Sequence, residues 1–290
     1  MEFVFALAAA LLFAVASVLQ QRAASEAPGS GTVRVGLLVH LAKRPMWLAG
    51  YAADWAAFGL QAAALGAGSL LIVQPLLVTG LLFALPFAAA WSGRRLGPQD
   101  WIAAFALCAG LGTFLLLGSP TGGVDRAPLH DWMLPGGVVL GVAAVALLGG
   151  LRVRGAGRAA LLALATGVAY GLTSALTKSS VSLLGDGVVA VFSHWEPYVL
   201  IVMAATGMVV NQAAFQAGDL AASLPTLTIA EPIVAAVIGV SVLDERVQAH
   251  GVLDWFLIIF ALAVMAYGVV VLAVRSAATA TPAPHSVPAA

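Results

Sequence analysis

Nine long apolar runs constrain this chain more than any other feature of its sequence. Each is about 20 residues long, the length that an α-helix needs to cross a hydrocarbon layer about 30 Å thick. The runs cover residues 2–22, 46–66, 69–91, 100–118, 134–151, 159–182, 197–217, 221–242 and 252–274. Only helices and closed barrels satisfy the backbone inside a bilayer, and these runs are continuous rather than alternating. The sequence therefore predicts an all-α polytopic membrane bundle of about nine transmembrane helices.

The scarcity of charge leads to the same conclusion. Charged residues make up 9% of the chain and hydrophobic residues 61%, whereas a soluble domain carries about 25% charged residues. Lipid must therefore cover most of the surface, and we expect a multi-pass protein of the cell membrane. The formal net charge is zero, so no basic surface points to nucleic acid.

The positions of lysine and arginine predict the orientation. If the nine runs are threaded in turn, ten of the thirteen basic residues fall on one side: Arg22, Arg34, Lys43, Arg44, Arg94, Arg95, Arg152, Arg154, Arg158 and Arg275. The other side receives Arg126, Lys178 and Arg246. Because basic residues are retained on the cytoplasmic side, we expect the N-terminus outside and the C-terminus inside a bacterial cytoplasmic membrane.

An internal repeat divides the chain into two halves. Pro75 falls on Pro225 with a shift of 150 residues, and Leu19 falls on Leu172 with a shift of 153. This pairs the first four runs with the last four and leaves the fifth without a partner. We expect a transmembrane domain over residues 1–275, with repeats at 1–118 and 134–275, and a disordered tail over 276–290. Matched helices run in opposite directions, and such a 4+5 inverted repeat is typical of transporters.

Two carboxyl groups, Asp54 and Glu231, lie deep inside predicted spans. An ionised side chain at mid-bilayer costs at least about 3 kcal/mol, so each of them needs a reason. Glu231 is flanked by Pro225 and Pro232, which each free a backbone carbonyl. Together with Thr228, they favour a hinged polar segment that binds a cation or a proton. The alternative is a protonated Glu231 that only hydrogen-bonds a neighbouring helix.

Other polar residues share helix faces with these carboxyls or lie in facing spans. Asp54 lies on one face with Gln61, which indicates either a cavity wall or a helix-packing seam. Gly167 and Gly171 permit close helix contact, and Lys178 is expected to reach the headgroups. The amides suit an uncharged or zwitterionic solute, although they also join helices. The predicted pathway residues are Glu231, Asp54, Tyr170, Thr173, Gln212, Asn211, Gln61 and Thr228.

No enzyme motif was found, and we expect neither catalysis nor a cofactor. His194 and Glu196 lie two residues apart and are interpreted as solvated loop residues, since one His and one Glu make a poor metal site. The expected partners are the lipid bilayer, a small-molecule or ion substrate and, as one option, a second copy of the chain.

The run PTLTIAEPIVAAVIGVSVLDERV, which begins at Pro225, resembles the late helices of the drug/metabolite transporter superfamily, in its EamA-like group. GSLLIVQPLLVTGLLFALPFAAAWSGRRLGPQDW, which begins at Gly68, is similar to the same unit in the first half, with Arg95 where the superfamily usually has Glu. The resemblance implies ten helices in two inverted halves, of which this chain lacks the first. Nine spans also resemble the NIPA-type magnesium transporter branch, but Ala56 and Gly59 occupy the positions of its helix-2 Glu and Asn.

These observations predict a secondary transporter or permease that moves small solutes or metabolites across the membrane. Two alternatives stay open: a divalent-cation transporter of the NIPA type, and a membrane scaffold subunit that transports nothing.

Overall fold

The computed structural model describes residues 1–25, 44–92, 96–217 and 220–280, and these residues are helical apart from short connections. The helices are α1 (Glu2–Ser25), α3 (Pro45–Ala67), α4 (Leu70–Val78), α5 (Gly80–Ser92), α6 (Pro98–Gly118), α7 (Leu129–Arg152), α8 (Gly155–Gly185), α9 (Val188–Ser193), α10 (Glu196–Gln216), α11 (Leu220–Ser241) and α12 (Val252–Ala280). The prediction of an all-α fold is confirmed for this part of the chain.

Every predicted span coincides with a helix or, for 69–91, with the pair α4 and α5. Seven segments of the described chain are long and apolar enough to cross a membrane: Glu2–Leu19, Leu70–Phe87, Pro98–Gly118, Leu129–Arg152, Gly155–Gly185, Ser223–Ser241 and Val252–Arg275. The chain is therefore a multi-pass membrane protein. The other two predicted spans lie in α3 and α10, which carry polar side chains such as Asp54 and Gln61 in α3 and Asn211 in α10.

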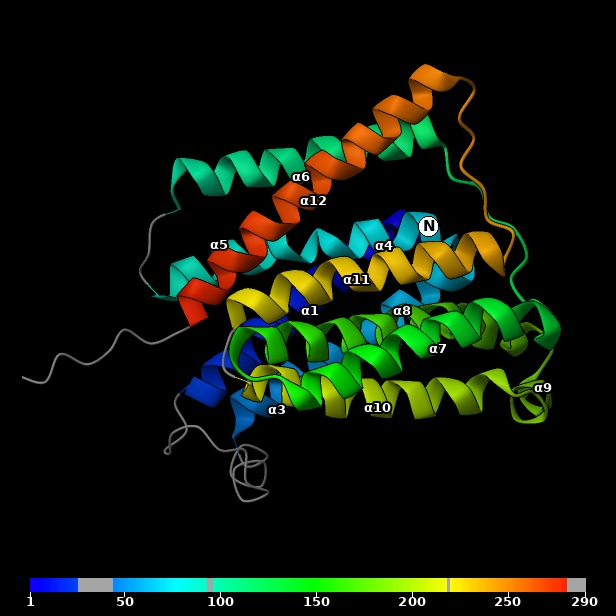
Figure 1. The fold of residues 1–290 in the computed structure, drawn as a ribbon, viewed down its shortest axis with the longest axis horizontal. Coiled ribbons are helices and arrows are strands. Elements are labelled where there is room, and N and C mark those ends of the chain that lie inside the picture. The colour runs from blue at the N-terminus through cyan, green and yellow to red at the C-terminus, as the bar shows by residue number, and fades with distance from the viewer. Residues whose placement is uncertain (26–43, 93–95, 218–219, 281–290) are drawn as a thin grey trace, which may run out of the picture.

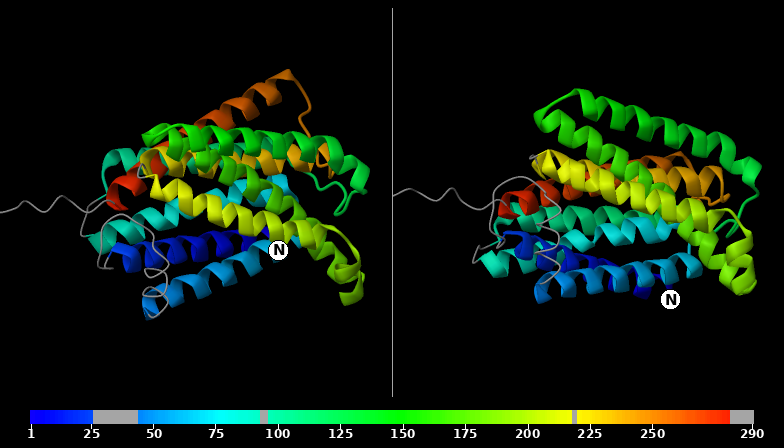
Figure 2. Two further views of the ribbon diagram at one scale, coloured as in Figure 1. Left: turned by 60° about the horizontal axis from the view of Figure 1, so that its bottom comes forward. Right: turned by 90° about the horizontal axis from the view of Figure 1, so that it is seen from below.

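The long helices lie side by side and run in alternating directions along the longest axis of the molecule (Figures 1 and 2). Helix α8 lies inside the bundle and packs against α3, α7, α10 and α11. The short helix α9 marks one end, which we call the α9 end. The start of α4 and the turn between α11 and α12 lie at this end too. Helix α1 begins toward the α9 end, and α12 ends at the opposite one.

Helices α6 and α12 form a crossing pair along one side of the bundle (Figure 1). A Cβ atom at Gly110 would lie 2.5 Å from the carbonyl oxygen of Ala261, and one at Gly268 would lie 2.7 Å from that of Ala103. Real Cβ atoms do not approach so closely, so each helix places a glycine where the other backbone crosses it. The pair is held by backbone-to-backbone packing, the usual mode between membrane helices.

The structure adds detail at two predicted boundaries. The run 69–91 is not one helix, because α4 ends at Val78 and α5 begins at Gly80. The Thr79 hydroxyl donates to the carbonyl oxygen of Leu76 at 2.6 Å, which satisfies a terminal acceptor of α4. Helix α12 continues through residues 276–280, the first five residues of the tail predicted as disordered. The remainder of that tail lies outside the described residues.

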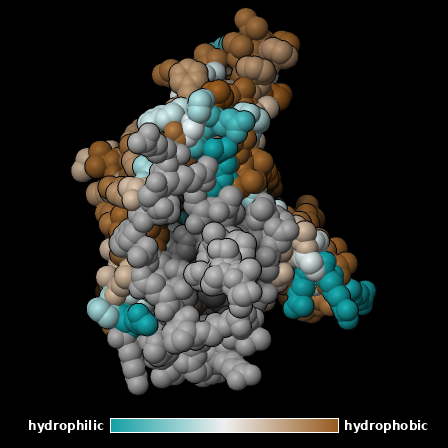
Figure 3. All heavy atoms as spheres, turned by 90° about the vertical axis from the view of Figure 1, so that its left-hand side faces the viewer, coloured by the Kyte–Doolittle hydropathy of each residue, from teal (hydrophilic) through white to brown (hydrophobic). Residues whose placement is uncertain are grey.

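The surface matches a lipid environment. Large apolar side chains are exposed along the flanks of α6, α7, α10 and α12. Figure 3 looks at the end opposite α9, where hydrophilic side chains gather while apolar ones cover the flanks. Three arginines around the α7–α8 turn, Arg152, Arg154 and Arg158, are exposed at this end. Their position follows the predicted segregation of basic residues.

Candidate functional site

Glu231 lies midway along α11, between two prolines that the helix accommodates without interruption. Helix α11 contains Pro225 and Pro232 within its bounds, and Glu231 is partly buried. The Thr228 hydroxyl donates to the Leu224 carbonyl oxygen at 2.8 Å, inside the same helix. The predicted hinge is thus a continuous helix here, although each proline still leaves one carbonyl without its intrahelical donor.

Helix α8 approaches the backbone of Glu231 directly, because two glycines face it. A Cβ atom at Gly171 would lie 2.6 Å from the carbonyl oxygen of Glu231, and one at Gly167 would lie 2.7 Å from the Cβ atom of Ala230. The close helix contact predicted from these glycines is confirmed, and its partner is α11. Any larger residue would move the carboxyl-bearing turn of α11 away from α8.

Tyr170, between the two glycines on α8, connects Glu231 to two other helices. A Cβ atom at Gly207 of α10 would lie 2.7 Å from ring atom Cε1 of Tyr170, so the ring packs against α10. Tyr170 also lies close enough to the carboxyl groups of Glu231 and Asp54 to interact electrostatically with both. Helix α8, which carries Tyr170, packs against both α11 with Glu231 and α3 with Asp54.

Helix α3 contributes a second contact with α8. The Gln61 amide donates through Nε2 to Oγ of Ser174 at 3.3 Å, and both side chains are buried. Asp54 lies two turns earlier on α3, where it is partly buried and interacts with Tyr51. Gln61 thus joins α3 to α8, while Asp54 lies near the level of Tyr170.

The predicted polar face of α8 is packed and contacts other helices. The buried hydroxyls of Thr166, Thr173 and Thr177 each donate to the carbonyl oxygen four residues earlier, at 2.8–2.9 Å. The Thr173 hydroxyl therefore donates its hydrogen bond within its own helix, as the Thr228 hydroxyl does. Either oxygen could still accept a hydrogen bond, but neither supplies a proton to a solute in this arrangement.

Helix α10 carries the remaining two predicted residues. Asn211 is partly buried, and its Oδ1 atom has no hydrogen-bond partner among the described residues. The side chain of Gln212 lies outside the described residues. Asn211 thus adds one unsatisfied acceptor on a helix that contacts α8.

One apolar groove lies between α7 and α8, and another lies among α5, α6 and α12. Neither is lined by Asp54, Tyr170 or Glu231. Among the described residues, no three His, Cys, Asp or Glu side chains come together as metal ligands. The Glu231 turn itself packs against α8 at Gly167 and Gly171.

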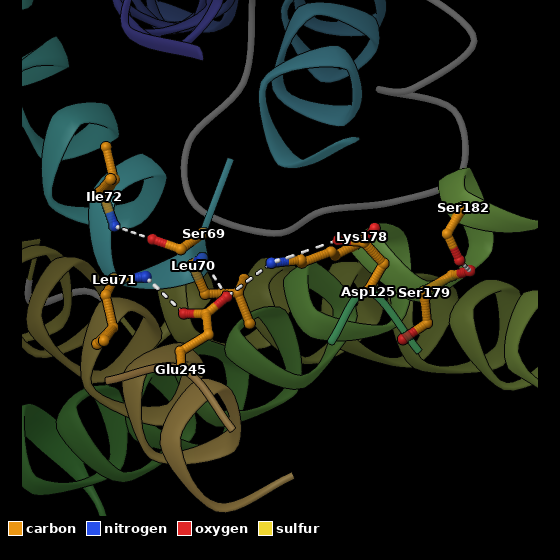
Figure 4. Close-up of polar contacts among 9 residues, drawn as sticks. All are labelled: Ser69, Leu70, Leu71, Ile72, Asp125, Lys178, Ser179, Ser182 and Glu245. Carbon is orange, nitrogen blue, oxygen red and sulfur yellow. Dashed lines mark hydrogen bonds and ion pairs between the residues drawn. The ribbon is translucent and has the colours of Figure 1, made fainter. Parts of the chain in front are cut away.

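Sequence reasoning missed a buried carboxylate, Glu245, in the turn between α11 and α12 (Figure 4). Glu245 is 0% exposed. Its Oε1 accepts from the Leu70 backbone N–H at 2.8 Å, and its Oε2 accepts from the Leu71 N–H at 3.0 Å. It therefore caps the first turn of α4, whose amides have no acceptor within the helix.

Lys178 of α8 completes this arrangement, and its predicted exposure to the headgroups was wrong. Its Nζ atom lies 2.8 Å from Oε1 of Glu245 and 4.0 Å from Oδ1 of Asp125, and the side chain is 2% exposed. A buried ammonium needs a paired charge, and Glu245 provides it. A lysine inside an apolar run was the available signal, because such residues are usually paired. We call Glu245, Lys178, Leu70 and Leu71 the Glu245 network.

The interpretation of residues 194–196 as solvated loop was also wrong. Glu196 begins α10, is 2% exposed, and its Oε2 atom has no partner among the described residues. The His194 ring nitrogen Nδ1 lies 2.8 Å from the Ala190 carbonyl oxygen. Trp195 packs edge-to-face on Trp132 of α7 with ring centroids 5.5 Å apart. This aromatic contact covers the start of α10.

Comparisons with known proteins place the chain in a family. No protein-family profile matches it, and no solved structure does. It is 38% identical over 257 residues to the uncharacterized protein Cgl0250/cg0304 of Corynebacterium glutamicum, and the match covers 87% of this chain and 86% of that protein. At this identity and coverage, the chain belongs to the same family as Cgl0250/cg0304.

Proposed function

We propose that this protein is a secondary transporter that moves small solutes across the cell membrane, with the N-terminus and the α9 end outside and the C-terminus in the cytoplasm. The observation that supports the proposal is the packing of α8 against the Glu231 turn of α11, beside Tyr170, in a helix that also packs against the Asp54-bearing helix α3. Carboxyl groups at this depth are costly and usually mark a pathway for ions or substrate.

An inverted repeat of nine spans is part of the proposal, and a sequence match at two helix starts supports it. Gly97-Pro-Gln-Asp100-Trp101 begins α6, and Gly251-Val-Leu-Asp254-Trp255 begins α12, with a shift of 154 between Asp100 and Asp254. Both aspartates cap their helix: Asp100 accepts from the Gly97 N–H at 2.7 Å, and Asp254 accepts from the His250 N–H at 3.0 Å.

The packing of the helices supports the same repeat. Helix α1 packs against α3, α4 and α5 in the first half, and α8 packs against α10 and α11 in the second. These are equivalent neighbours if α1 corresponds to α8, α3 to α10, and α4 with α5 to α11. The chain direction is reversed between the halves (Figure 1). Membership of the drug/metabolite transporter superfamily is proposed on this arrangement and on the sequence resemblance.

Flux measurements in proteoliposomes test the proposal. The purified chain is reconstituted, the vesicles are loaded with a pH-sensitive dye, and amino acids, amines and sugars are added outside one at a time. We expect one class to change the lumenal pH and Glu231→Gln to abolish that change. Asp186→Asn, at an exposed carboxyl near the α9 end, is the matched control and should behave as wild type.

Each other outcome has a definite meaning. If Glu231→Gln moves protons like wild type, Glu231 does not couple transport. A second set of vesicles carries a magnesium-sensitive dye. If these vesicles respond to an external Mg²⁺ gradient, the transported substrate is a divalent cation and not a small solute. Vesicles that pass neither solutes, protons nor Mg²⁺ would reject transport and favour a scaffold.

A further inference from the structure

The Glu245 network joins the two halves of the chain at the α9 end. Its carboxylate lies in the turn after α11, and Lys178 belongs to α8, so both come from the second half. The two amides that it accepts from, those of Leu70 and Leu71, open α4 in the first half. One buried side chain thus holds the start of a first-half helix against two elements of the second half.

The amides of Leu70 and Leu71 depend on Glu245 for their hydrogen bonds. The first N–H groups of a helix have no acceptor within it, and the positive end of the helix dipole favours an anion. Ser69 satisfies the next amide, since its Oγ accepts from the Ile72 N–H at 3.2 Å. The amides of Leu70 and Leu71 therefore report whether Glu245 still accepts their hydrogen bonds.

The backbone on both sides of Glu245 is hydrogen-bonded to the linking segment, residues 119–128, which joins α6 of the first half to α7. The Thr121 N–H donates to the Arg246 carbonyl oxygen at 2.9 Å, and the Val124 N–H donates to that of Leu243 at 2.8 Å. A Cβ atom at Gly123 would lie 1.9 Å from the Leu243 oxygen, so only glycine fits there. Movement of the Glu245 turn must therefore carry the linking segment with it.

The buried ion pair between Lys178 and Glu245 is suited to a contact that forms and breaks as the protein changes conformation. A buried pair contributes little net stability compared with apolar packing, but loss of one partner is costly. Such a contact is stable when complete and has no stable half-formed state, as a two-state element requires. Asp125 of the linking segment, 4.0 Å from Lys178 Nζ, gives the ammonium a second anion nearby.

We propose that Glu245 is a latch: its carboxylate holds α4 against α8 and the α11–α12 turn, and its release opens the α9 end of the bundle as one unit. The use of this opening in alternating access rests on the proposed transport function. The opening itself does not, and it can be measured without any solute.

Amide hydrogen exchange on the full chain in lipid nanodiscs tests the latch. Glu245→Gln keeps the shape of the side chain but removes the charge that Lys178 and the α4 amides share. We expect exchange at Leu70 and Leu71 to become at least roughly tenfold faster, because a charged hydrogen-bond acceptor is lost. For a latch, the amides of Thr121 and Val124 must accelerate by a similar factor, because a cooperative unit opens together.

Asp100→Asn is the matched control at the opposite end. Asp100 also caps a helix start and pairs with a basic residue, Arg275 of α12. This variant should accelerate exchange near Gly97 and leave residues 70, 71, 121 and 124 unchanged. If Glu245→Gln does not fold, Lys178→Met carries the same expectation with a smaller factor.

Three results would overturn the latch. Acceleration confined to Leu70 and Leu71 would make Glu245 a local helix cap. Unchanged exchange in Glu245→Gln would make it dispensable to the closed state. Acceleration at Thr121 and Val124 in Asp100→Asn as well would indicate general loosening of the bundle. None of these results bears on whether vesicles transport a solute, so the two proposals fail separately.

Discussion

Nζ of Lys178 lies 2.8 Å from Oε1 of Glu245, and the two side chains are 2% and 0% exposed. The residues are 67 positions apart in the chain, on either side of α10 and α11. The carboxylate is also bonded to two backbone amides, so three elements converge on one charge. The α9 end therefore contains a buried ion pair on which three elements depend, and its removal should have measurable effects.

Glu245→Ala is expected to destabilise the protein strongly. It leaves the Lys178 ammonium buried without its main partner and two amides without acceptors, and breaking a buried pair costs about 3–5 kcal/mol. Unfolding by denaturant in detergent micelles measures the loss. Arg246→Gln, one residue along at an exposed ion pair with Asp244, is the control and should change stability little. Equal stability of the two variants would contradict the buried pair.

Exchanging the two charges should not rescue the protein. The double variant Lys178→Glu/Glu245→Lys restores an ion pair, but it places an ammonium where the first amides of α4 need an acceptor. Cations at a helix N-terminus are unfavourable. We expect the double variant to stay within about 1 kcal/mol of Glu245→Ala. Recovery to wild-type stability in the same unfolding measurement would show that pairing with Lys178 alone matters.

The helices were predictable from the sequence, whereas their polar contacts were not. An apolar run of about 20 residues has few alternatives in lipid, so every predicted span proved helical. The contact between Gly171 and α11 was half-predictable: the glycine spacing indicated close approach but not its partner. Glu245 lies between the predicted spans 221–242 and 252–274, and its burial depends on α4 and α8, which lie far from it in sequence.

The break between α4 and α5 and the core at Tyr170 show the same limit. Thr79 ends α4 by a hydrogen bond to Leu76, which a hydropathy pattern does not contain. Asp54 and Glu231 stood out individually because charge is rare in a span. That both lie near Tyr170 follows only from the arrangement of α3, α8 and α11.

Gly171→Ala is expected to separate α8 from α11. The added methyl group would lie 2.6 Å from the Glu231 carbonyl oxygen, and overpacking of this kind costs about 1–3 kcal/mol. Gly141→Ala is the control, because a Cβ atom there meets nothing within 4 Å. That change should be neutral or stabilise α7 by up to about 1 kcal/mol through helix propensity. The free energies of unfolding of both variants, measured under the same conditions, test this expectation. A Gly171→Ala variant as stable as wild type would contradict the close contact.

The hydrogen bond between Gln61 and Ser174 should appear as a coupling between α3 and α8. Gln61→Leu and Ser174→Ala each leave one buried polar group unpaired, whereas the double variant leaves none of that pair. The double variant should therefore be more stable than the sum of the single changes by about 0.5–1.5 kcal/mol. A double-mutant cycle measured by denaturant unfolding gives this value directly. Strict additivity would mean that the two side chains do not interact.

Tyr170→Phe separates the packing of the Tyr170 ring from the role of its hydroxyl. The ring packs against Gly207 of α10, and Phe keeps that packing, so the free energy of unfolding should change by less than about 1.5 kcal/mol. The hydroxyl, near the carboxyl groups of Asp54 and Glu231, is lost. If the hydroxyl contacts the solute or the coupling ion, its removal should lower flux in proteoliposomes by about threefold to tenfold, which corresponds to the free energy of one hydrogen bond.

Gly207→Ala provides the opposite case, because its methyl group would lie 2.7 Å from the ring and should lower stability while the hydroxyl stays. A Tyr170→Phe protein that transports at the wild-type rate would remove Tyr170 from the pathway and leave it a packing residue between α8 and α10.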